Sequence, residues 1–585
     1  MKTRILFLAL ISIFAFSSCE DFLKEDPKGQ LNESFLKTET GLQKLAVGLY
    51  ADDAHDLIKN LQVIVEGGTD EITFAMGSSA EKRTKYQNVD TESYNKNLWK
   101  NIYKMLNDCN FGLKAIQEVD FSSENAYNQT FGEFSFFRAW ICWMIVELWG
   151  EYAHYQDVPT ESVVTAGFQT TVDVWYKLIL GDLDAAISHL NTNPSKVGEL
   201  TVGAAKALKA RALMSLAQYS EAQIAATGFY SNRNGVYTAA KELADQLIAP
   251  SSGYKLLDDY GSIFDIKNEN NAEIIWALQM TTDENYKYGT NIMSKMYTAY
   301  PMYSIREKKK LSKINGLYEH SAWYGRYQCD NMPTYYYVSL FEPGDERAEG
   351  TFETAYQALW SDQTGTYSDM GTPFMNGQPT DTIVYRPLRD VSDAEAKAYK
   401  ARGIYCDGLN MIYPVSNNRN PVGNRNADTR RACNTIKKYL DRTRTAPKQD
   451  SHGTDINILR LGEQYLIAAE CAYYLSGQNA AKKYLDALRD RAEETPGCLD
   501  VDASKIDIDY ILDERTREMG AELIRFFDLK RTGKWDRVKK YNADTQFFDP
   551  AVHCLLAIPV SELEAISNYP DEFKQNPAYV STTAE

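Results

Sequence analysis

The sequence feature that most constrains the fold is a helical spacing of apolar residues between positions 134 and 148. On one side of this segment they recur at steps of three and four: Phe134, Phe137, Ile141, Ile145 and Leu148. The opposite side is also apolar, with Phe136, Trp140, Trp143 and Val146. A helix that is apolar nearly all round is buried on both faces. The segment therefore predicts a central helix with other helices packed around it, and its tryptophans are assigned to the core.

The same spacing predicts further helices over residues 98–116, 172–190, 204–217, 237–248, 461–475, 481–492 and 507–527. Alanines fill the 204–217 segment, so that a neighbouring helix can approach closely. Consecutive helices of this length favour antiparallel hairpins stacked as in tetratricopeptide arrays, although no clean period of 34 residues is present. The predicted fold class is mainly α, a tetratricopeptide-like scaffold of helical hairpins.

Helical periodicity fades between residues 253 and 453, where Gly, Pro, Asn and Asp punctuate the chain. This stretch predicts loops and short strands built onto the helical scaffold. Tyr335, Tyr336 and Tyr337 are interpreted as a strand that enters the core with alternating faces. The predicted division is an N-terminal scaffold over 19–252, a loop-rich region over 253–453, a C-terminal helical part over 454–535 and a surface tail over 536–585.

The N-terminus has the pattern of a secretory signal peptide. Lys2 and Arg4 precede a short apolar run from Ile5 to Phe16, which is too short to span a bilayer comfortably. Small residues then lead to Cys19, and this ending resembles a bacterial lipobox. Residues 1–18 are therefore predicted to be removed and Cys19 to be acylated, which would tether the mature chain to a membrane.

Composition and motifs argue against several classes of function. The formal net charge is −17, which disfavours nucleic acid as a partner. The six histidines are scattered and no Cys-x-x-Cys is present, so we expect no metal site, no cofactor and no disulfide framework. No catalytic motif is found. Glu514, Glu518 and Glu522 share one helix face with several arginines, which indicates a structural ion-pair network rather than a catalytic pair.

Aromatic residues concentrate in one part of the loop-rich region. Between Tyr286 and Tyr337 the chain carries 11 tyrosines in 52 residues, against 39 in the 585 of the whole chain. Tyrosine and tryptophan present an apolar face with a polar edge, which suits the CH face and the hydroxyls of a sugar ring. Trp323, Tyr324, Tyr300 and Tyr303 are the candidate ligand-binding residues here, although packing of the loops onto the helices accounts for part of this set.

A series of short motifs in a fixed order resembles the SusD/RagB family of outer-membrane nutrient-binding lipoproteins. The segment from Cys19 to Pro27 is similar to the family's post-lipobox sequence. Further matches lie at 48–50, 110, 132–133, 137–139, 149–150, 182–183, 186, 204–211, 333–334, 345–347, 460–461, 465–466, 469–471, 489–492, 514–515, 518, 525, 528–533, 558–559 and 575–579. Ala557 and Ala578 depart from the family's usual proline and glycine. The order of the motifs, more than any one of them, carries the resemblance.

The resemblance implies a tetratricopeptide-like scaffold with a variable ligand face and no enzyme activity. It implies a lipoprotein on the extracellular face of the outer membrane that delivers a glycan to a SusC-like TonB-dependent transporter. Acidic residues behind Cys19 resemble the surface-export signal of Bacteroidetes lipoproteins. Family ligand sites also draw on a loop that falls here at 67–97, which adds Asp70, Phe74, Arg83 and Tyr86 to the candidate ligand-binding residues. RagB-like capture of peptides is the alternative function, which would favour charged clamps over flat aromatics.

Overall fold

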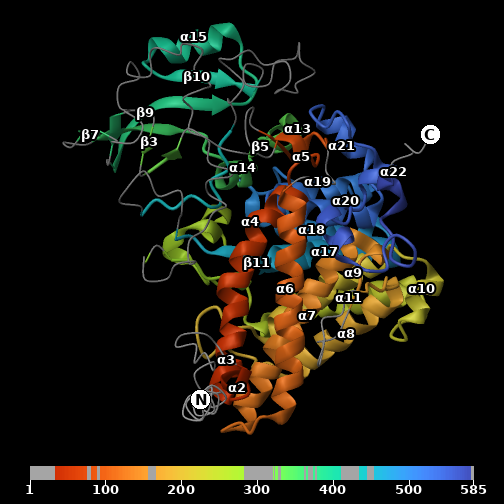
Figure 1. Ribbon diagram of the computed structural model, residues 1–585. Helices are drawn as coiled ribbons and strands as arrows, with labels where there is room; N and C mark the ends of the chain where they lie inside the picture. Colours follow the sequence, from red (N-terminus) through yellow and green to blue (C-terminus); the bar gives the residue numbers. More distant parts are fainter. Residues whose placement is uncertain are drawn as a thin grey trace, which may run out of the picture.

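The chain folds as a stack of helices with small β-sheets at one end (Figure 1). The computed structural model describes residues 33–74, 81–87, 93–155, 166–281, 283, 320–321, 323–326, 331–360, 364–366, 373–375, 378–409, 434–443 and 453–580. Within these residues, no helix combines the length and the apolar character needed to cross a membrane.

The scaffold is a series of helices packed on one another. The N-terminal helices are α2 (Glu33–Leu36), α3 (Glu39–Gly48), α4 (Ala54–Val65), α5 (Glu81–Thr84), α6 (Ser93–Ala115), α7 (Glu124–Trp149), α8 (Val172–His189), α9 (Val202–Leu216), α10 (Glu221–Ala226) and α11 (Arg233–Ile248). Helix α7 packs on α6 and α8, α8 packs on α9, and α9 packs on α11. The helices predicted between residues 98 and 248 are all present, and the mainly helical fold class is confirmed.

The central helix is positioned by its ends and by its burial. Ser123 Oγ accepts a hydrogen bond from Ala126 N at 3.1 Å and caps the start of α7. Gly150, with a φ of 65°, ends it. Trp140, Trp143 and Trp149 are each at most 2% exposed, so the prediction that these tryptophans belong to the core is confirmed.

The chain returns to this stack after its loop-rich region. The C-terminal helices are α17 (Leu461–Ser476), α18 (Gln478–Ala492), α19 (Ile508–Met519), α20 (Arg525–Thr532), α21 (Asp536–Tyr541), α22 (Pro550–His553) and α23 (Val560–Ala565). Helix α17 packs on α11 and α18. An antiparallel pair of strands, β2 (Ile274–Leu278) and β11 (Ile456–Arg460), closes the loop-rich region by joining its two ends. The helical scaffold is thereby continuous in space although it is interrupted in sequence.

In the described part of the chain, three small sheets lie outside the scaffold. The first pairs β1 (Ile72–Phe74) with β5 (Asn331–Pro333). The second has the order β10 (Tyr405–Gly408), β9 (Gln378–Leu388) and β6 (Tyr356–Trp360). The third has the order β4 (Gly325–Arg326), β3 (His320–Ser321), β8 (Pro373–Met375) and β7 (Thr364–Thr366). Three short helices accompany them: α13 (Tyr335–Ser339), α14 (Arg347–Thr351) and α15 (Asp393–Ala401). In Figure 1 the second and third sheets lie at the opposite end of the molecule from α3.

Two expectations about local structure were wrong. Tyr335, Tyr336 and Tyr337 begin a helix, not a strand, because Thr334 Oγ1 accepts a hydrogen bond from Tyr337 N and caps it. The single helix predicted over 507–527 is two helices. Ala521 and Leu523 have φ values of 66° and 68°, which break the helix between α19 and α20. Lys438 Nζ and Tyr439 Oη donate to the carbonyls of Gly520 and Ala521 at 3.0 and 2.7 Å, which compensates the lost helical bonds.

The C-terminal segment does not run over the surface as expected. Phe548, Leu556, Ile558 and Phe573 are at most 2% exposed and belong to the main core. Leu556 N donates to the carbonyl of Leu148 at the end of α7, at 2.7 Å. The sequence did not predict this burial, because an irregular segment can bury isolated apolar side chains without forming a helical face.

The contact between α6 and α7 depends on a glycine. A Cβ built on Gly112 would lie 2.4 Å from Cε1 of Phe134, which is itself fully buried. We expect Gly112→Ala to lower the free energy of unfolding by about 1–3 kcal/mol, measured by chemical denaturation. Gly181→Ala is the control: it also lies inside a helix, but nothing lies within 4 Å of its added Cβ. This substitution is expected to be neutral or to stabilise by up to about 1 kcal/mol. Equal effects of the two would contradict the close packing.

Candidate functional site

The candidate residues from the 67–97 segment lie in the interior, so their assignment as ligand-binding residues is corrected. Asp70 is fully buried, and both its carboxylate oxygens are occupied by arginines. Arg525 donates to them at 2.6 and 2.7 Å, and Arg537 Nε donates at 2.9 Å. Burial alone would raise the pKa of Asp70, but the two guanidinium groups outweigh it and hold the pKa below its usual range. Asp70 therefore joins the start of the chain to its C-terminal helices and has no surface for a ligand.

Phe74, Arg83 and Tyr86 are buried as well, and each is at most 3% exposed. Arg83 donates to the carbonyl of Ile64 at 3.3 Å, and Tyr86 Oη donates to the carbonyl of Gly68 at 3.2 Å. The Tyr86 ring packs against Phe548 and His553. Tyr86 therefore fastens the segment after α4 to the C-terminal segment, which sequence spacing could not reveal because Phe548 and His553 are more than 400 positions away.

The aromatic candidate residues of the loop-rich region fall into two groups. Tyr300 and Tyr303 lie outside the described residues, as does Cys19. Trp323 and Tyr324 form the turn between β3 and β4. Tyr324 is only 2% exposed, and its hydroxyl accepts a hydrogen bond from Gln357 N at 2.7 Å. Tyr324 is therefore corrected to a supporting residue, whereas Trp323 is partly exposed.

Trp323 stands on a packed base. The rings of Tyr324 and Tyr356 lie 4.8 Å apart between centroids, and those of Tyr356 and Tyr385 lie 5.4 Å apart. Tyr356 Oη donates to Thr435 Oγ1 at 3.0 Å. We call Trp323, Tyr324, Tyr356 and Tyr385 the aromatic cluster. Tyr356 lies in β6 and Tyr385 in β9, both in the second sheet, whereas Trp323 and Tyr324 lie between β3 and β4 of the third sheet. The cluster therefore links the second and third sheets.

A guanidinium group lies over the exposed end of this cluster. Arg442 Cζ is 5.0 Å from the centroid of Trp323 and 5.8 Å from that of Tyr324. Its Nη2 lies 2.5 Å from Glu353 Oε2. A cation over an indole face is attracted by the ring quadrupole, so Arg442 and Trp323 hold each other in place. This arginine could not be predicted from the sequence, because no local pattern distinguishes it within a polar stretch.

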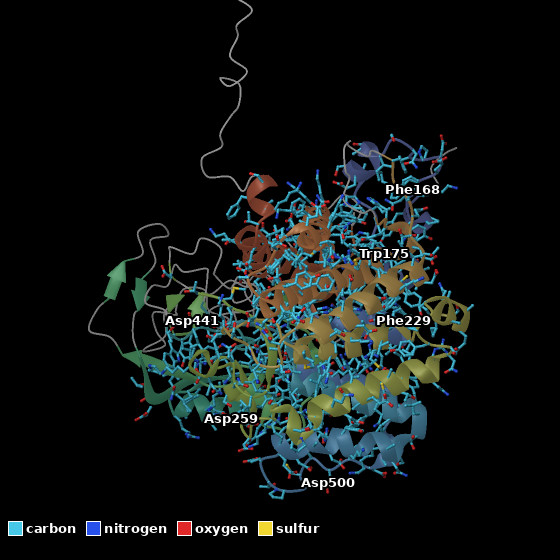
Figure 2. All side chains as sticks on the ribbon, turned by 90° about the horizontal axis from the view of Figure 1, so that it is seen from below. Phe168, Trp175, Phe229, Asp259, Asp441 and Asp500 are labelled. Carbon is cyan, nitrogen blue, oxygen red and sulfur yellow. The ribbon has the colours of Figure 1, made fainter. Side chains whose placement is uncertain are left out.

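Arg442 also lines an open cavity of about 570 Å³. Carboxylates and cations both surround it: Asp259, Asp265, Glu346, Glu349, Lys437 and Arg442. Burial lowers the pKa of Lys437, partly offset by nearby carboxylates. Figure 2 labels Asp259, one of these lining residues. A partly exposed indole beside such groups can stack against an apolar face and hydrogen-bond a polar edge of the same ligand.

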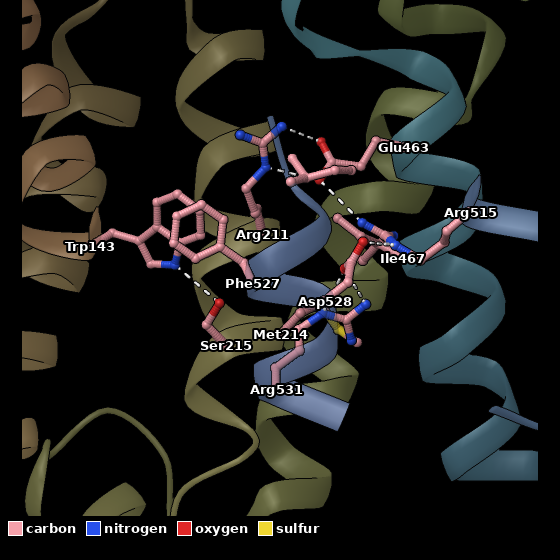
Figure 3. Close-up of a pocket in the computed structure, with 11 residues that line it drawn as sticks. Trp143, Arg211, Met214, Ser215, Glu463, Ile467, Arg515, Phe527, Asp528 and Arg531 are labelled. Carbon is pink, nitrogen blue, oxygen red and sulfur yellow. Dashed lines mark hydrogen bonds and ion pairs between the residues drawn. The ribbon is translucent and has the colours of Figure 1, made fainter. Parts of the chain in front are cut away.

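A small enclosed pocket inside the scaffold has a different character (Figure 3). It holds only about 10 Å³ between α9, α17, α19 and α20. Arg211 binds Glu463 at 2.6 Å, and Arg515 and Arg531 each bind Asp528 at 2.7 Å. Its charged groups are thus paired with one another, and the space is no larger than about one water molecule. This pocket is part of the core.

The ion-pair network expected for Glu514, Glu518 and Glu522 is confirmed. Arg347 binds Glu514 at 2.7 Å, Arg491 binds Glu518 at 2.6 Å, and Lys438 binds Glu522 at 2.7 Å. Burial would raise the pKa of Glu514, but the surrounding arginines lower it to about 2. A carboxylate held in its charged form inside the core is neither a proton donor near neutral pH nor open to a substrate. Among the described residues, no three His, Cys, Asp or Glu side chains group in a way that could hold a metal ion.

The fold and this surface together define a class of protein: a helical-hairpin scaffold that presents an aromatic and charged face on loops and small sheets. Two family models match the chain. The model of the SusD family matches residues 272–555, and the model described as "Starch-binding associating with outer membrane" matches residues 21–214. The chain belongs to the SusD/RagB family.

Individual relatives are distant in sequence but cover nearly the whole chain. The SusD-like protein P25 of Formosa agariphila is 23% identical over 608 residues, which cover 96% of this chain and 97% of that protein. A SusD homologue from Bacteroides thetaiotaomicron has a TM-score of 0.69 at 14% identity, covering 93% and 99% of the two chains. Surface glycan-binding protein A from the same species, solved with laminarihexaose, has a TM-score of 0.61 at 17% identity, covering 91% and 98%.

Proposed function

We propose that this protein is a non-catalytic surface lipoprotein that binds an oligosaccharide and delivers it to a SusC-like TonB-dependent transporter. Acylation at Cys19 would anchor it on the extracellular face of the outer membrane. The observation that carries the glycan assignment is the partly exposed Trp323, held by Arg442 beside a polar cavity of about 570 Å³. Family membership and the laminarihexaose complex of a structural neighbour support the same ligand class.

The proposed roles of the segments follow from how the elements are joined. Residues 19–252 and 454–535 supply the scaffold, and residues 253–453 carry the ligand face. The paired strands β2 and β11 fix the ends of this region, so its loops can vary without disturbing the helices. A rigid base under a variable surface suits a family whose members bind different ligands.

Isothermal titration against a panel of soluble polysaccharides and mixed peptides tests the ligand class. The protein would be residues 20–585, without the predicted signal peptide and lipidation site. We expect saturable heat with one glycan class and about tenfold or more weaker binding for Trp323→Ala, because an aromatic anchor is lost. Trp323→Phe should retain part of the affinity, since a flat apolar face remains.

Phe168→Ala is the matched control. Phe168 is 61% exposed and labelled well away from the strands of the loop-rich region in Figure 2, so its loss should leave affinity unchanged. Heat with peptides alone would favour the RagB-like alternative, for which the charged groups around the Arg442 cavity offer clamps. Unchanged affinity in Trp323→Ala would refute the aromatic site. Release of shortened glycans during incubation would refute a purely binding role.

A further inference from the structure

A second cavity lies at the end of the scaffold remote from the aromatic cluster. It has a volume of about 450 Å³ and lies between α3, the turn that follows it, the start of α7 and the loop after α8. In Figure 1, α3 and the strand β3 beside Trp323 are at opposite ends of the molecule. The two cavities share no lining residue. A volume of this size is within the range of small-molecule sites.

The inner wall of this cavity is a connected hydrogen-bond network. Tyr50 Oη donates to Glu133 Oε1 at 2.9 Å, and Gln129 Nε2 donates to the same oxygen at 3.1 Å. Glu133 is 9% exposed and Gln129 is 8% exposed. The polar groups of the wall are thus held in fixed positions before any ligand arrives, which lowers the entropy cost of binding.

The outer rim is a loop that is anchored at several points. Gln129 Oε1 accepts from Asn191 N at 3.0 Å, and Leu200 N donates to Tyr50 Oη at 3.1 Å. Trp276 Nε1, from β2, donates to the carbonyl of Gly198 at 3.2 Å. The rim over residues 191–200 is therefore tied to the inner wall and to the scaffold.

The cavity has hydrogen-bonding capacity that the described part of the protein does not use. Both side-chain hydrogen bonds to Glu133 fall on Oε1, and Oε2 has no hydrogen-bond partner among the described residues. Asn125, at an exposed position, and Asn191, which is half-buried, also line the cavity, and neither side-chain amide has a hydrogen-bond partner among the described residues. Burial raises the pKa of Glu133 to about 7, so near neutral pH its carboxyl group can donate as well as accept.

Apolar surface accompanies these polar groups. Val47 from α3 and Val197 from the rim both line the cavity, and they are 60% and 71% exposed. Exposed valines beside unused amides and a carboxyl group offer a ligand both CH contacts and hydrogen bonds. Lys196 and Glu199 also line the cavity, and Glu199 accepts from Ser195 N. Because Lys196 and Glu199 carry opposite charges, the cavity has little net charge with which to favour an ionic ligand.

We infer that this cavity is a second ligand site, distinct from the aromatic cluster, for a small neutral polyhydroxylated molecule of about one or two sugar rings. Its hydroxyls would bond Glu133 Oε2 and the amides of Asn125 and Asn191, and its CH face would contact Val47 and Val197. This inference goes beyond the proposed capture of oligosaccharide, because a site at the opposite end of the scaffold binds independently of Trp323.

Ligand-observed saturation-transfer NMR tests the inference with four probes: glucose, galactose, mannose and N-acetylglucosamine. All proteins carry Trp323→Ala, so the aromatic cluster does not contribute to the signal. We expect at least one probe to bind saturably at about 10 mM or below. Val197→Trp, which fills the cavity mouth from an exposed position, should weaken this binding about tenfold or more. Asn191→Ala should weaken it about fivefold, the loss of one hydrogen bond.

Val174→Trp provides the matched control. Val174 is 48% exposed on α8 and does not line the cavity, so this variant should bind the probe as its parent does. Circular dichroism would verify that all variants are folded. The inference is overturned if none of the four probes binds the Trp323→Ala parent, or if Val197→Trp and Asn191→Ala both bind with unchanged affinity. Neither result bears on the aromatic site, which the titration of the unmodified chain tests separately.

Discussion

Asp70→Asn is expected to lower the free energy of unfolding by about 3–5 kcal/mol without a selective loss of ligand binding. The substitution keeps the shape of the side chain and removes its charge. Arg525 and Arg537 are each at most 2% exposed, and both bind Asp70. Taking away a carboxylate from two buried guanidinium groups leaves charge in the core that water cannot solvate.

Chemical denaturation measures this effect, and titration with glycan measures binding by the folded fraction. Asp258→Asn is the control, since the Asp258 side chain is 97% exposed and lies 3.8 Å from Lys255. Its effect on stability should be within about 0.5 kcal/mol. A stable Asp70→Asn variant with weakened glycan binding would contradict the structural role and return Asp70 to the ligand site.

The second large effect is acid lability below pH 4.5. The pKa of Glu514 is about 2 in the folded protein, against an ordinary value of 4.5. Its contribution to stability is therefore complete above pH 4.5 and is lost as the pH falls through about 2. For this carboxylate alone the loss is about 3 kcal/mol, of which about 2 kcal/mol is gone by pH 3. Glu518 and Glu522, whose pKa values are also lowered, act in the same direction.

Other carboxyl groups act in the opposite direction at higher pH. Burial raises the pKa of Glu133 and of Glu269 to about 7. Their protonated forms favour the folded state, so their contribution is present below pH 4.5 and declines as the pH rises through 7. The ion-pair network is therefore tested between pH 4.5 and 2.5, where Glu133 and Glu269 are protonated in the folded protein. Burial lowers the pKa of His154 and of His553 to about 4, so protonation of these two residues adds to the loss of stability in this range, and the Glu514→Gln comparison isolates the carboxylate.

Denaturant midpoints measured across that window test the network. We expect the midpoint to fall steeply as the pH falls, and Glu514→Gln to flatten part of the slope. Glu124→Gln, at an exposed position in the first turn of α7, should leave the slope unchanged. A pH-independent midpoint between pH 4.5 and 2.5 would contradict the assignment of these carboxylates to charged, arginine-bound groups.

The scaffold was predictable from sequence because its signals are local. Apolar residues at steps of three and four identified α6 to α9, α11, α17 and α18, since a helix repeats its faces within a few residues. The alternating charges between residues 514 and 531 likewise indicated an ion-pair network. The break between α19 and α20 was missed because its cause is not local: the carbonyls it exposes are bonded by Lys438 and Tyr439, some 80 positions away.

The candidate site shows the same difference between local and long-range information. Sequence by itself determined that aromatic residues gather in the loop-rich region and that Trp323 is among them, because composition is visible without a fold. Only the tertiary structure decided that Asp70, Phe74, Arg83, Tyr86 and Tyr324 are buried and that Arg442 lies over Trp323. Burial and ion pairing depend on which distant segments meet, and no pattern within a short stretch of sequence carries that information.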